Sequence, residues 1–389
     1  MRPLTLIAGL LVPGLLAASV AGAAELALSA NDNKMVLENG VTKTVRNPPP
    51  DTLSIIDLAA QPPALRAEIE VPASVVGPPI SVAITPDQRL ALVTANQRPD
   101  PGDPGKLAPG NAMAVVDLAA QPPRVVATVP TGSAPAGVAI NRAGTLALVA
   151  NRSEGTVSVF RIENGQVSPA GKVEIGPVGA EVSGVAFTPD GRHALVTRYG
   201  DHAVNVLAVD GTKVTKTDRE MTAGVRPYGL AVTPDGHWAV VANIGRGTGD
   251  ADTVSLIDLS REPWRVVDTV SVGQTPEGIM TSPDNRHVAV VLVNGSNKPK
   301  DSPFYSTGRV KLLRIDEGRL APASEADIGH WPQGAAFSAD GRTLLVGNMV
   351  EKNIFVFRVG ADGKLTDTGT RIPVAGGSAT LRTADAPAR

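Results

Sequence analysis

Three side chains beside recurring apolar segments could together carry out proton-transfer chemistry. His330 and Glu277 can each hold or release a proton, and Arg226 can stabilise a developing negative charge. Each lies at or just before the start of an apolar segment. The three are therefore candidate catalytic groups if the fold brings those starts together. The alternative interpretation is that all three are solvated rim residues.

A second candidate site lies at Arg198-Tyr199-Gly200-Asp201-His202. Arg198 occupies a position where the corresponding segments carry asparagine, so its guanidinium could offer a fixed fork to a carboxylate or phosphate. A salt bridge to Asp201 or Glu181 is the alternative. The full set of predicted ligand-binding residues is Arg198, Tyr199, His202, Arg226, Tyr228, Glu277, His330 and Trp331.

The elements that must position these residues are short β-strands of a repeat. The segment Gly229-Leu-Ala-Val-Thr-Pro-Asp-Gly236 combines an apolar strand with a tight turn, and related segments begin at residues 81, 137, 184, 278 and 334. Proline presets the second position of such a turn, and aspartate and glycine accept the conformations that finish it. A period of about 50 residues with about four short strands per repeat predicts the blades of a β-propeller.

The two ends of the chain predict how the ring closes. Residues 25–72 contain a second, third and fourth strand but no first strand, whereas Gly377-Ser-Ala-Thr-Leu-Arg382 resembles a first strand with nothing after it. We therefore predict an all-β fold, a seven-bladed β-propeller of four-stranded antiparallel blades. Its C-terminal strand completes the N-terminal blade, so that the ring has no exposed seam.

Loop lengths predict which face of the propeller carries function. The loops between the second and third strands are long at residues 32–50, 97–111, 244–252 and 294–308, but short at 152–155 and 349–353. Length variation on a regular scaffold is typical of a binding surface. We call this the variable-loop face and the opposite one the turn face. Function is expected around the mouth of the central channel on the variable-loop face, and an apolar tip at residues 303–305 would favour a protein partner.

The first residues predict export. Met1 to Ala23 combines Arg2, an apolar run and a small-residue end, which is typical of a signal peptide, and residues 24–389 then form the propeller. We expect a periplasmic or secreted monomer with no membrane span after signal removal. The 36 Lys and Arg residues nearly balance the 38 Asp and Glu residues, which argues against a broad nucleic-acid surface.

Metal and thiol chemistry have little support in the sequence. The chain has no cysteine, and its five histidines are scattered, so no zinc pattern is present. The acidic loops at residues 100–103 and 250–252 do not supply the ligand count of a calcium loop. No metal and no cofactor are therefore predicted.

Two kinds of known propeller resemble this chain. Thr253-Val-Ser-Leu-Ile-Asp-Leu259 and Ala239-Val-Val-Ala-Asn243 are similar to the repeats of the YVTN-type seven-bladed propellers, a family of exported proteins. The segment from Phe355 to Leu365 resembles a strand hairpin of the lactonase-like propellers, which include 6-phosphogluconolactonase. The resemblance implies a seven-bladed fold and, from the second family, lactone hydrolysis.

The sequence thus favours an exported binding or scaffold protein that recognises a small anionic ligand or another exported protein at the variable-loop face. The alternative that the second resemblance implies is a lactonase-like hydrolase, working without metal through His330, Glu277 and Arg226. A further alternative is a propeller subunit that supports a periplasmic redox enzyme. Both alternatives stay open on the sequence alone.

Overall fold

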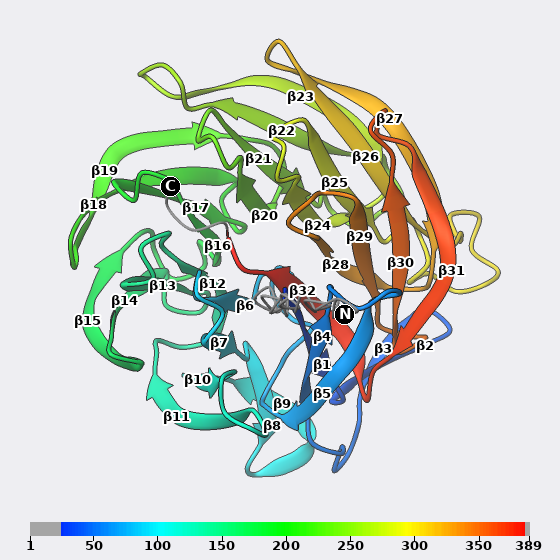
Figure 1. Cartoon of the computed structure of the whole chain (residues 1–389), viewed down its shortest axis with the longest axis horizontal. Coiled ribbons are helices and arrows are strands. Elements are labelled where there is room, and N and C mark those ends of the chain that lie inside the picture. Colours follow the sequence, from blue (N-terminus) through cyan, green and yellow to red (C-terminus); the bar gives the residue numbers. More distant parts are fainter. Residues whose placement is uncertain (1–24, 386–389) are drawn as a thin grey trace, which may run out of the picture.

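The computed structural model describes residues 25–385 of the 389-residue chain, and these residues form a seven-bladed β-propeller of four-stranded antiparallel sheets. Viewed down the shortest axis of the molecule, successive blades are arranged around the centre in chain order, and β32 returns to lie beside β1 (Figure 1). The predicted fold class and blade count are confirmed. The predicted signal peptide, residues 1–23, lies outside the described residues.

Each blade contributes one strand to each of four concentric rings. The innermost strands are β32 (Gly377–Thr383), β6 (Val82–Ile84), β12 (Pro135–Ile140), β16 (Val182–Phe187), β20 (Pro227–Val232), β24 (Pro276–Thr281) and β28 (Pro332–Phe337). The second strands are β1 (Leu26–Asp32), β7 (Leu90–Thr94), β13 (Leu146–Asn151), β17 (His193–Arg198), β21 (Trp238–Asn243), β25 (His287–Leu292) and β29 (Thr343–Asn348).

The two outer rings complete the blades. The third strands are β4 (Thr52–Asp57), β10 (Ala112–Asp117), β14 (Thr156–Glu163), β18 (Ala203–Asp210), β22 (Asp252–Asp258), β26 (Gly308–Asp316) and β30 (Asn353–Val359). The outermost strands are β5 (Ala64–Glu70), β11 (Arg124–Pro130), β15 (Gln166–Glu174), β19 (Lys213–Thr222), β23 (Arg265–Gly273), β27 (Arg319–Ile328) and β31 (Leu365–Pro373).

The ring closes as the sequence predicts. Strand β32 pairs antiparallel with β1, in a register that runs from Ala27 opposite Thr383 to Asp32 opposite Gly377. The hydroxyls of Ser29 and Ser378 lie 2.8 Å apart across this pair. Because β1 therefore has a partner on both sides, blade 1 has no open inner edge.

The recurring Thr-Pro-Asp-Gly segments form the turns between first and second strands. In blade 4, the Thr188 hydroxyl donates to Asp190 Oδ1 at 2.6 Å, and the Gly191 amide donates to the Thr188 carbonyl at 2.9 Å. Gly191 has a φ of +69°, a left-handed conformation that glycine adopts without a steric cost. The local sequence therefore accounts for the short, uniform turns of the turn face.

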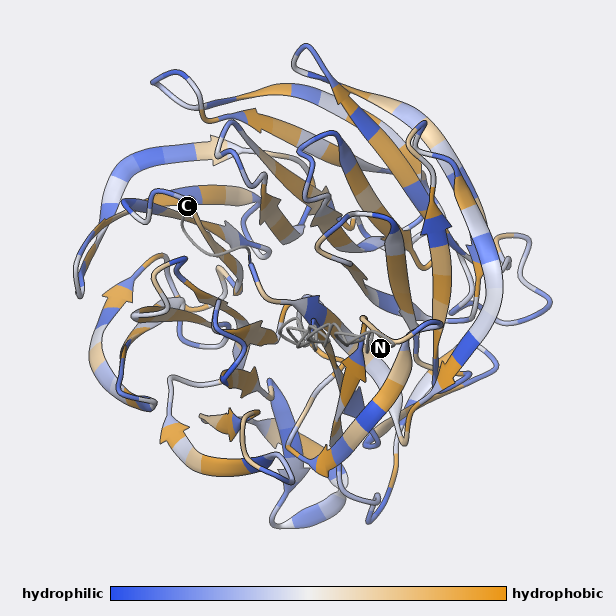
Figure 2. Cartoon of the chain, viewed as in Figure 1, coloured by the Kyte–Doolittle hydropathy of each residue, from blue (hydrophilic) through white to orange (hydrophobic). Residues whose placement is uncertain are grey.

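Aliphatic side chains fill the interfaces between blades. Figure 2 shows that apolar residues run along the inner and middle strands, while polar residues gather in the loops and outer strands. Glycine permits close approach at the centre: a Cβ on Gly278 would lie 2.2 Å from the Gln333 carbonyl oxygen of the next inner strand. The tight centre therefore requires glycine at this position of the repeat.

Two of the long variable loops contain hairpins that were predicted as loops. The loop of blade 1 forms β2 (Met35–Glu38) and β3 (Val41–Thr44), and that of blade 2 forms β8 (Gln97–Asp100) and β9 (Asp103–Pro109). The first hairpin reaches the loop of blade 6, where the Lys300 amide donates to Asn39 Oδ1 at 3.1 Å. The long loops of blades 1 and 6 therefore support one another above the ring.

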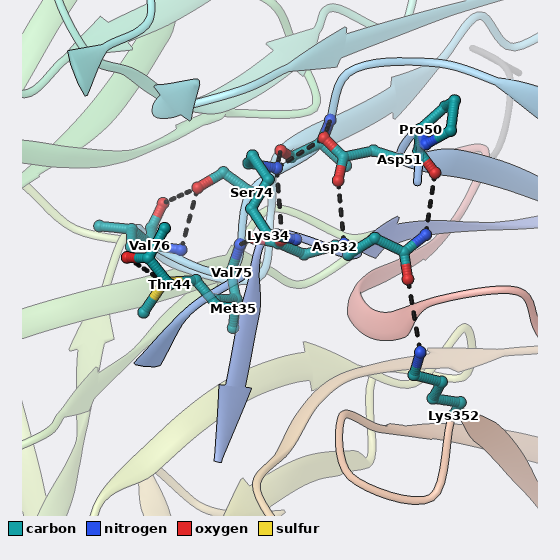
Figure 3. A network of polar contacts seen from close by, with 12 residues as sticks. Asp32, Lys34, Met35, Thr44, Pro50, Asp51, Ser74, Val75, Val76 and Lys352 are labelled. Atoms are coloured by element: carbon teal, nitrogen blue, oxygen red, sulfur yellow. Dashed lines mark hydrogen bonds and ion pairs between the residues drawn. The ribbon is translucent and has the colours of Figure 1, made fainter. Parts of the chain in front are cut away.

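A buried ionic network holds the base of the blade 1 hairpin, as Figure 3 shows. Lys34 Nζ lies 2.5 Å from Asp51 Oδ2 and 3.2 Å from Asp32 Oδ1, and it also donates to the Ala73 carbonyl. The second Asp32 oxygen accepts from the Val75 amide at 2.7 Å. Each charge in this network therefore has a partner, which is the condition for keeping buried ions.

Candidate functional site

The channel mouth on the variable-loop face is built from positions that repeat in successive blades. The residue before the inner strand has a left-handed backbone in five blades, at Ala134, Glu181, Arg226, Thr275 and Trp331. Its carbonyl accepts from the amide of the residue that follows the second strand; for example, the Tyr199 amide donates to the Glu181 carbonyl at 3.1 Å. The repeat therefore fixes where these side chains start, and the residue type decides what each mouth position offers.

Blades 3, 4 and 5 carry two cations and two tyrosines at or next to these positions. Arg152 and Tyr199 follow the second strand, Arg226 precedes the inner strand, and Tyr228 is the second residue of that strand. The guanidinium carbon of Arg152 lies 4.6 Å from the Tyr199 ring centre and 5.8 Å from that of Tyr228, and that of Arg226 lies 5.0 Å from Tyr199. The two tyrosine rings are 5.6 Å apart. Arg152 of blade 3 thus reaches Tyr228 of blade 5 past blade 4, which is expected only where blades converge at the axis. We call these four residues, together with Glu181, the cation–aromatic cluster.

One carboxylate neutralises part of this cluster. Arg152 Nη2 donates to Glu181 Oε2 at 3.0 Å. Burial lowers the pKa of Arg152, but Tyr228 and Glu181 more than offset this, so the guanidinium stays charged. Among residues 25–385, the Arg226 side chain makes a single hydrogen bond, a long one of 3.5 Å from Nη1 to the Gly245 carbonyl. The cluster therefore holds two guanidinium groups and one carboxylate, which pairs with Arg152, so it carries an excess of positive charge.

Glu277 lies in the inner strand of blade 6, at the position that Tyr228 holds in blade 5. Its half-buried carboxyl group makes no hydrogen bond or ion pair with any residue that the structure describes. Burial raises the pKa of Glu277 to about 7, and Arg152 opposes part of that rise. The same burial, with the nearby charge of Glu277, raises the pKa of Tyr228. Glu277 can therefore gain or lose a proton near neutral pH.

The opposite side of the mouth is apolar. Trp331, Met349, Met35, Val75 and Val76 pack together there with Ala379, between blades 7 and 1. A small cavity of about 150 Å³ adjoins this side and is lined by residues of the blade 1 hairpin, Trp331 and Met349. The mouth therefore presents charge on one side and apolar surface on the other, and Trp331 belongs to the apolar side.

Arg198 lies within blade 4 and is paired there. Its Nε donates to Asp201 Oδ1 at 2.9 Å, its Nη1 donates to Asn205 Oδ1 at 3.0 Å, and it also bonds Glu220. Asparagine at the same position in blade 3, Asn151, likewise bonds the next strand, donating to the Ser158 hydroxyl at 2.9 Å. This geometry favours the structural alternative for Arg198, the salt bridge, over an anion site.

The two predicted histidines are both engaged by neighbouring groups. His202 Nδ1 accepts from the Arg226 amide at 3.1 Å and so helps to hold that residue in its left-handed conformation. His330 Nδ1 lies 2.6 Å from Glu351 Oε1, and its Nε2 lies 2.9 Å from the Tyr305 hydroxyl. His330 is thus bound within blade 7 and the blade 6 loop, whereas the contacts of Arg226 and the electrostatic coupling of Glu277 both lead to the cation–aromatic cluster.

Sequence reasoning missed Arg152, which joins the cluster most closely. A signal was present: Arg152 follows Asn151 at the end of the second strand of blade 3, just as Tyr199 follows Arg198 in blade 4. The sequence pattern marks Arg152 only as the first residue of a short loop, residues 152–155. Tyr199, Arg226, Tyr228 and Glu277 were all in the predicted set.

Residues 25–385 show neither a metal site nor a membrane-spanning helix. No group of three or more His, Cys, Asp or Glu side chains in this range is placed to hold a metal ion. No helix in the range is long and apolar enough to cross a membrane.

Comparison with known proteins shows that other β-propellers share this fold. No protein-family model matches the chain, and no curated protein matches it in sequence. Similar solved structures include a candidate 6-phosphogluconolactonase of Bacteroides fragilis, at 18% identity over 94% of this chain and 99% of that chain (TM-score 0.71). The periplasmic gluconolactonase PpgL of Pseudomonas aeruginosa is similar at 17% identity over 93% and 99% (TM-score 0.67).

The fold is not restricted to proteins with lactonase names. The hydrazine synthase of Kuenenia stuttgartiensis is similar at 19% identity over 81% of this chain and 91% of that chain (TM-score 0.60). At such identities the likeness shows a shared propeller fold, and function must be argued from the residues at the site.

Proposed function

We propose that this protein is an exported binding protein that recognises a small organic anion at the channel mouth of the variable-loop face. One observation carries the proposal: the guanidinium groups of Arg152 and Arg226 both lie against the Tyr199 ring, and of the two only Arg152 forms an ion pair with a carboxylate of residues 25–385, that of Glu181. Stacking on tyrosine orients each guanidinium, and its remaining N–H groups suit a carboxylate or phosphate.

The rest of the mouth narrows the class of ligand. The apolar side around Trp331 and Met349 fits a hydrocarbon or sugar-ring face, while Glu277 can accept or donate a hydrogen bond to a hydroxyl group. A hydroxy acid with a compact body, such as a sugar acid, would satisfy both sides. The likeness to a periplasmic gluconolactonase agrees with this class and with a periplasmic location.

The test is a thermal-shift and calorimetric screen with gluconate, 6-phosphogluconate and simple dicarboxylates. A ligand of this site should bind at least about tenfold more weakly to Arg152→Met and to Arg226→Met, because each change removes a charge-assisted contact. The matched control is Arg371→Met. Arg371 also lies over an aromatic ring, that of Phe355, but on the outer strand of blade 7. Equal affinities in all three variants would exclude the mouth as the site.

A second function, lactone hydrolysis, is favoured by one specific observation. Glu277 is a carboxyl group without a partner among residues 25–385, its pKa is about 7, and Arg152 lies near it. The Glu277 carboxylate would take a proton from water, and the water oxygen would add to the lactone carbonyl while Arg152 stabilises the oxyanion. The ring C–O bond would then break, and the departing oxygen would take the proton back to give the hydroxy acid.

Hydrolysis is tested by following δ-gluconolactone above its uncatalysed rate. Wild-type activity should rise with pH through about 7, and Glu277→Gln should lower it at least 100-fold, the usual contribution of a general base. His330→Ala should leave most of the activity, since His330 is bound by Glu351 and Tyr305. Binding of gluconate without any turnover would reject the enzyme and leave the binding function standing.

A further inference from the structure

The other mouth of the channel, on the turn face, contains a cavity of about 260 Å³ that is partly open to solvent. The cavity lies between the inner strands, and prolines of the tight turns stand at its rim. Most of its lining is apolar. The lining residues include Ala139, Val185, Ala186, Leu230, Ala231, Met280, Phe337 and Arg382.

Strand register shows that Arg382 is exceptional at its position. In every blade the corresponding inner-strand residue faces the third residue of the second strand, as Arg382 faces Leu28 and Ala231 faces Val240. The other six blades carry only alanine or methionine there, namely Ala83, Ala139, Ala186, Ala231, Met280 and Ala336. One blade therefore adds a single guanidinium to an otherwise apolar ring.

The Arg382 guanidinium is not fully paired within residues 25–385. Its Nε is buried and has no hydrogen-bond partner there. Burial lowers the pKa of Arg382, and the one nearby charge that opposes this is that of Asp385, an exposed residue at the cavity edge. Arg382 as a whole is half-buried, and a buried Nε without a partner among these residues is costly, so this position is suited to an anion that enters the cavity.

The other charged groups of the cavity are already used. Glu25 Oε1 accepts from the Ala339 amide at 2.5 Å, and Arg142 Nη2 donates to the Pro234 carbonyl at 2.6 Å. The cavity is thus bordered by two acidic residues, Glu25 and Asp385, and by two basic ones, Arg142 and Arg382, of which Arg382 has a buried nitrogen without a partner in residues 25–385. This balance suits a singly charged anion better than a doubly charged phosphate.

We infer that the turn-face cavity binds a small monocarboxylate with an apolar body, whose carboxylate pairs with Arg382. This site is separate from the cation–aromatic cluster, because the two lie at opposite ends of the channel. The apolar residues of the inner strands would contact the body of the ligand. The inference does not depend on the function proposed for the variable-loop face.

The probes are benzoate and hexanoate, with inorganic phosphate for comparison, titrated calorimetrically into the purified protein. Benzoate or hexanoate should bind wild type, and Arg382→Met should weaken that binding at least tenfold. Methionine is the residue that blade 6 carries at this position, so the change is compatible with the fold. Arg371→Met, on the outer strand of blade 7 and outside both mouths, should leave the affinity within about twofold.

A second variant guards against a misfolded Arg382→Met. Ala231→Leu keeps the guanidinium but fills part of the cavity, and it should also abolish binding. Three results would overturn the inference: no binding of either carboxylate to wild type, full affinity in Arg382→Met, or loss of binding in Arg152→Met instead. Phosphate binding as tight as that of benzoate would equally contradict it.

Discussion

Charged side chains gather in two regions of this propeller, and the two regions differ in how completely these charges are paired. We call the β1–β32 pair, together with the ionic network at its end, the seam of blade 1. In the seam, Lys34 contacts Asp32, Asp51 and a backbone carbonyl, so its charge is fully satisfied inside the protein. At the channel mouth of blades 3 to 6, Glu277 has no partner among residues 25–385, and Arg226 has only a long one. Complete pairing marks the seam as structural, and incomplete pairing marks the mouth as a place for a ligand.

The largest effect is expected from opening the seam itself. Deleting residues 377–389 removes β32, so β1 loses a whole pairing partner and its inner edge becomes open. We expect the melting temperature to fall by more than about 10 °C, or the protein not to fold. Deleting only residues 386–389 is the control and should change little. An unaltered melt in the longer deletion would contradict the role of closure.

The next effect tests whether the seam charges are structural. Lys34→Met leaves Asp32 and Asp51 buried without their cation, which should lower the free energy of unfolding by about 3–5 kcal/mol. Lys43→Met removes an exposed partner of Glu38 in the same hairpin and should cost less than about 0.5 kcal/mol. Urea denaturation of both variants checks the difference. Similar costs would remove the contrast drawn above.

At the mouth, Glu277 predicts a pH dependence of stability. Its pKa is about 7 in the folded protein and 4.5 as a model value, so the folded state binds the proton more tightly. This contribution is fully present below about pH 4.5 and is lost as the pH rises through 7, by at most about 3 kcal/mol. Unfolding free energies at pH 5, 6 and 7.5 should show the decline in wild type and not in Glu277→Gln. If the unfolding free energy of Glu277→Gln falls with pH as steeply as that of wild type, another group causes the pH dependence.

The smallest expected effect is on stability, from replacing Arg198 in blade 4. Arg198→Met should cost about 1–2 kcal/mol, because Asp201 and Glu220 are partly exposed and can be solvated without it. Ligand affinity should be unchanged, in contrast to Arg152→Met. Loss of binding together with unaltered stability would show that Arg198, and not Arg152, serves the mouth.

The repeat made most of the fold predictable. Each Thr-Pro-Asp-Gly turn marks a blade locally, and the incomplete ends at residues 26–31 and 377–382 require each other. The blade 1 hairpin was missed although Asn39-Gly40 is a strong local signal for a two-residue turn between β2 and β3. Its strands are only four residues long, so they give little alternation to read.

The candidate site was less predictable because pairing depends on distant residues. Arg198 and Arg152 stand at neighbouring positions of two blades, and nothing in their immediate sequence separates them. Arg198 donates a hydrogen bond to Asn205 and forms an ion pair with Glu220, which the register of β18 and β19 brings to it. His330 is likewise engaged by Glu351 and Tyr305 from other segments. The sequence located the mouth positions, but only the register shows which cations are already paired.

Strand β32 also determines the order in which the blades can complete their folding during synthesis. Ser29 lies near the start of the chain, and its partner Ser378 is separated from it by 349 positions. Six blades can assemble as the polypeptide emerges, but the first one must wait with an unpaired edge for the last residues to be made. A chain truncated before β32 would therefore keep the unpaired edge of β1 exposed. Truncated copies should consequently aggregate much more readily than intact ones.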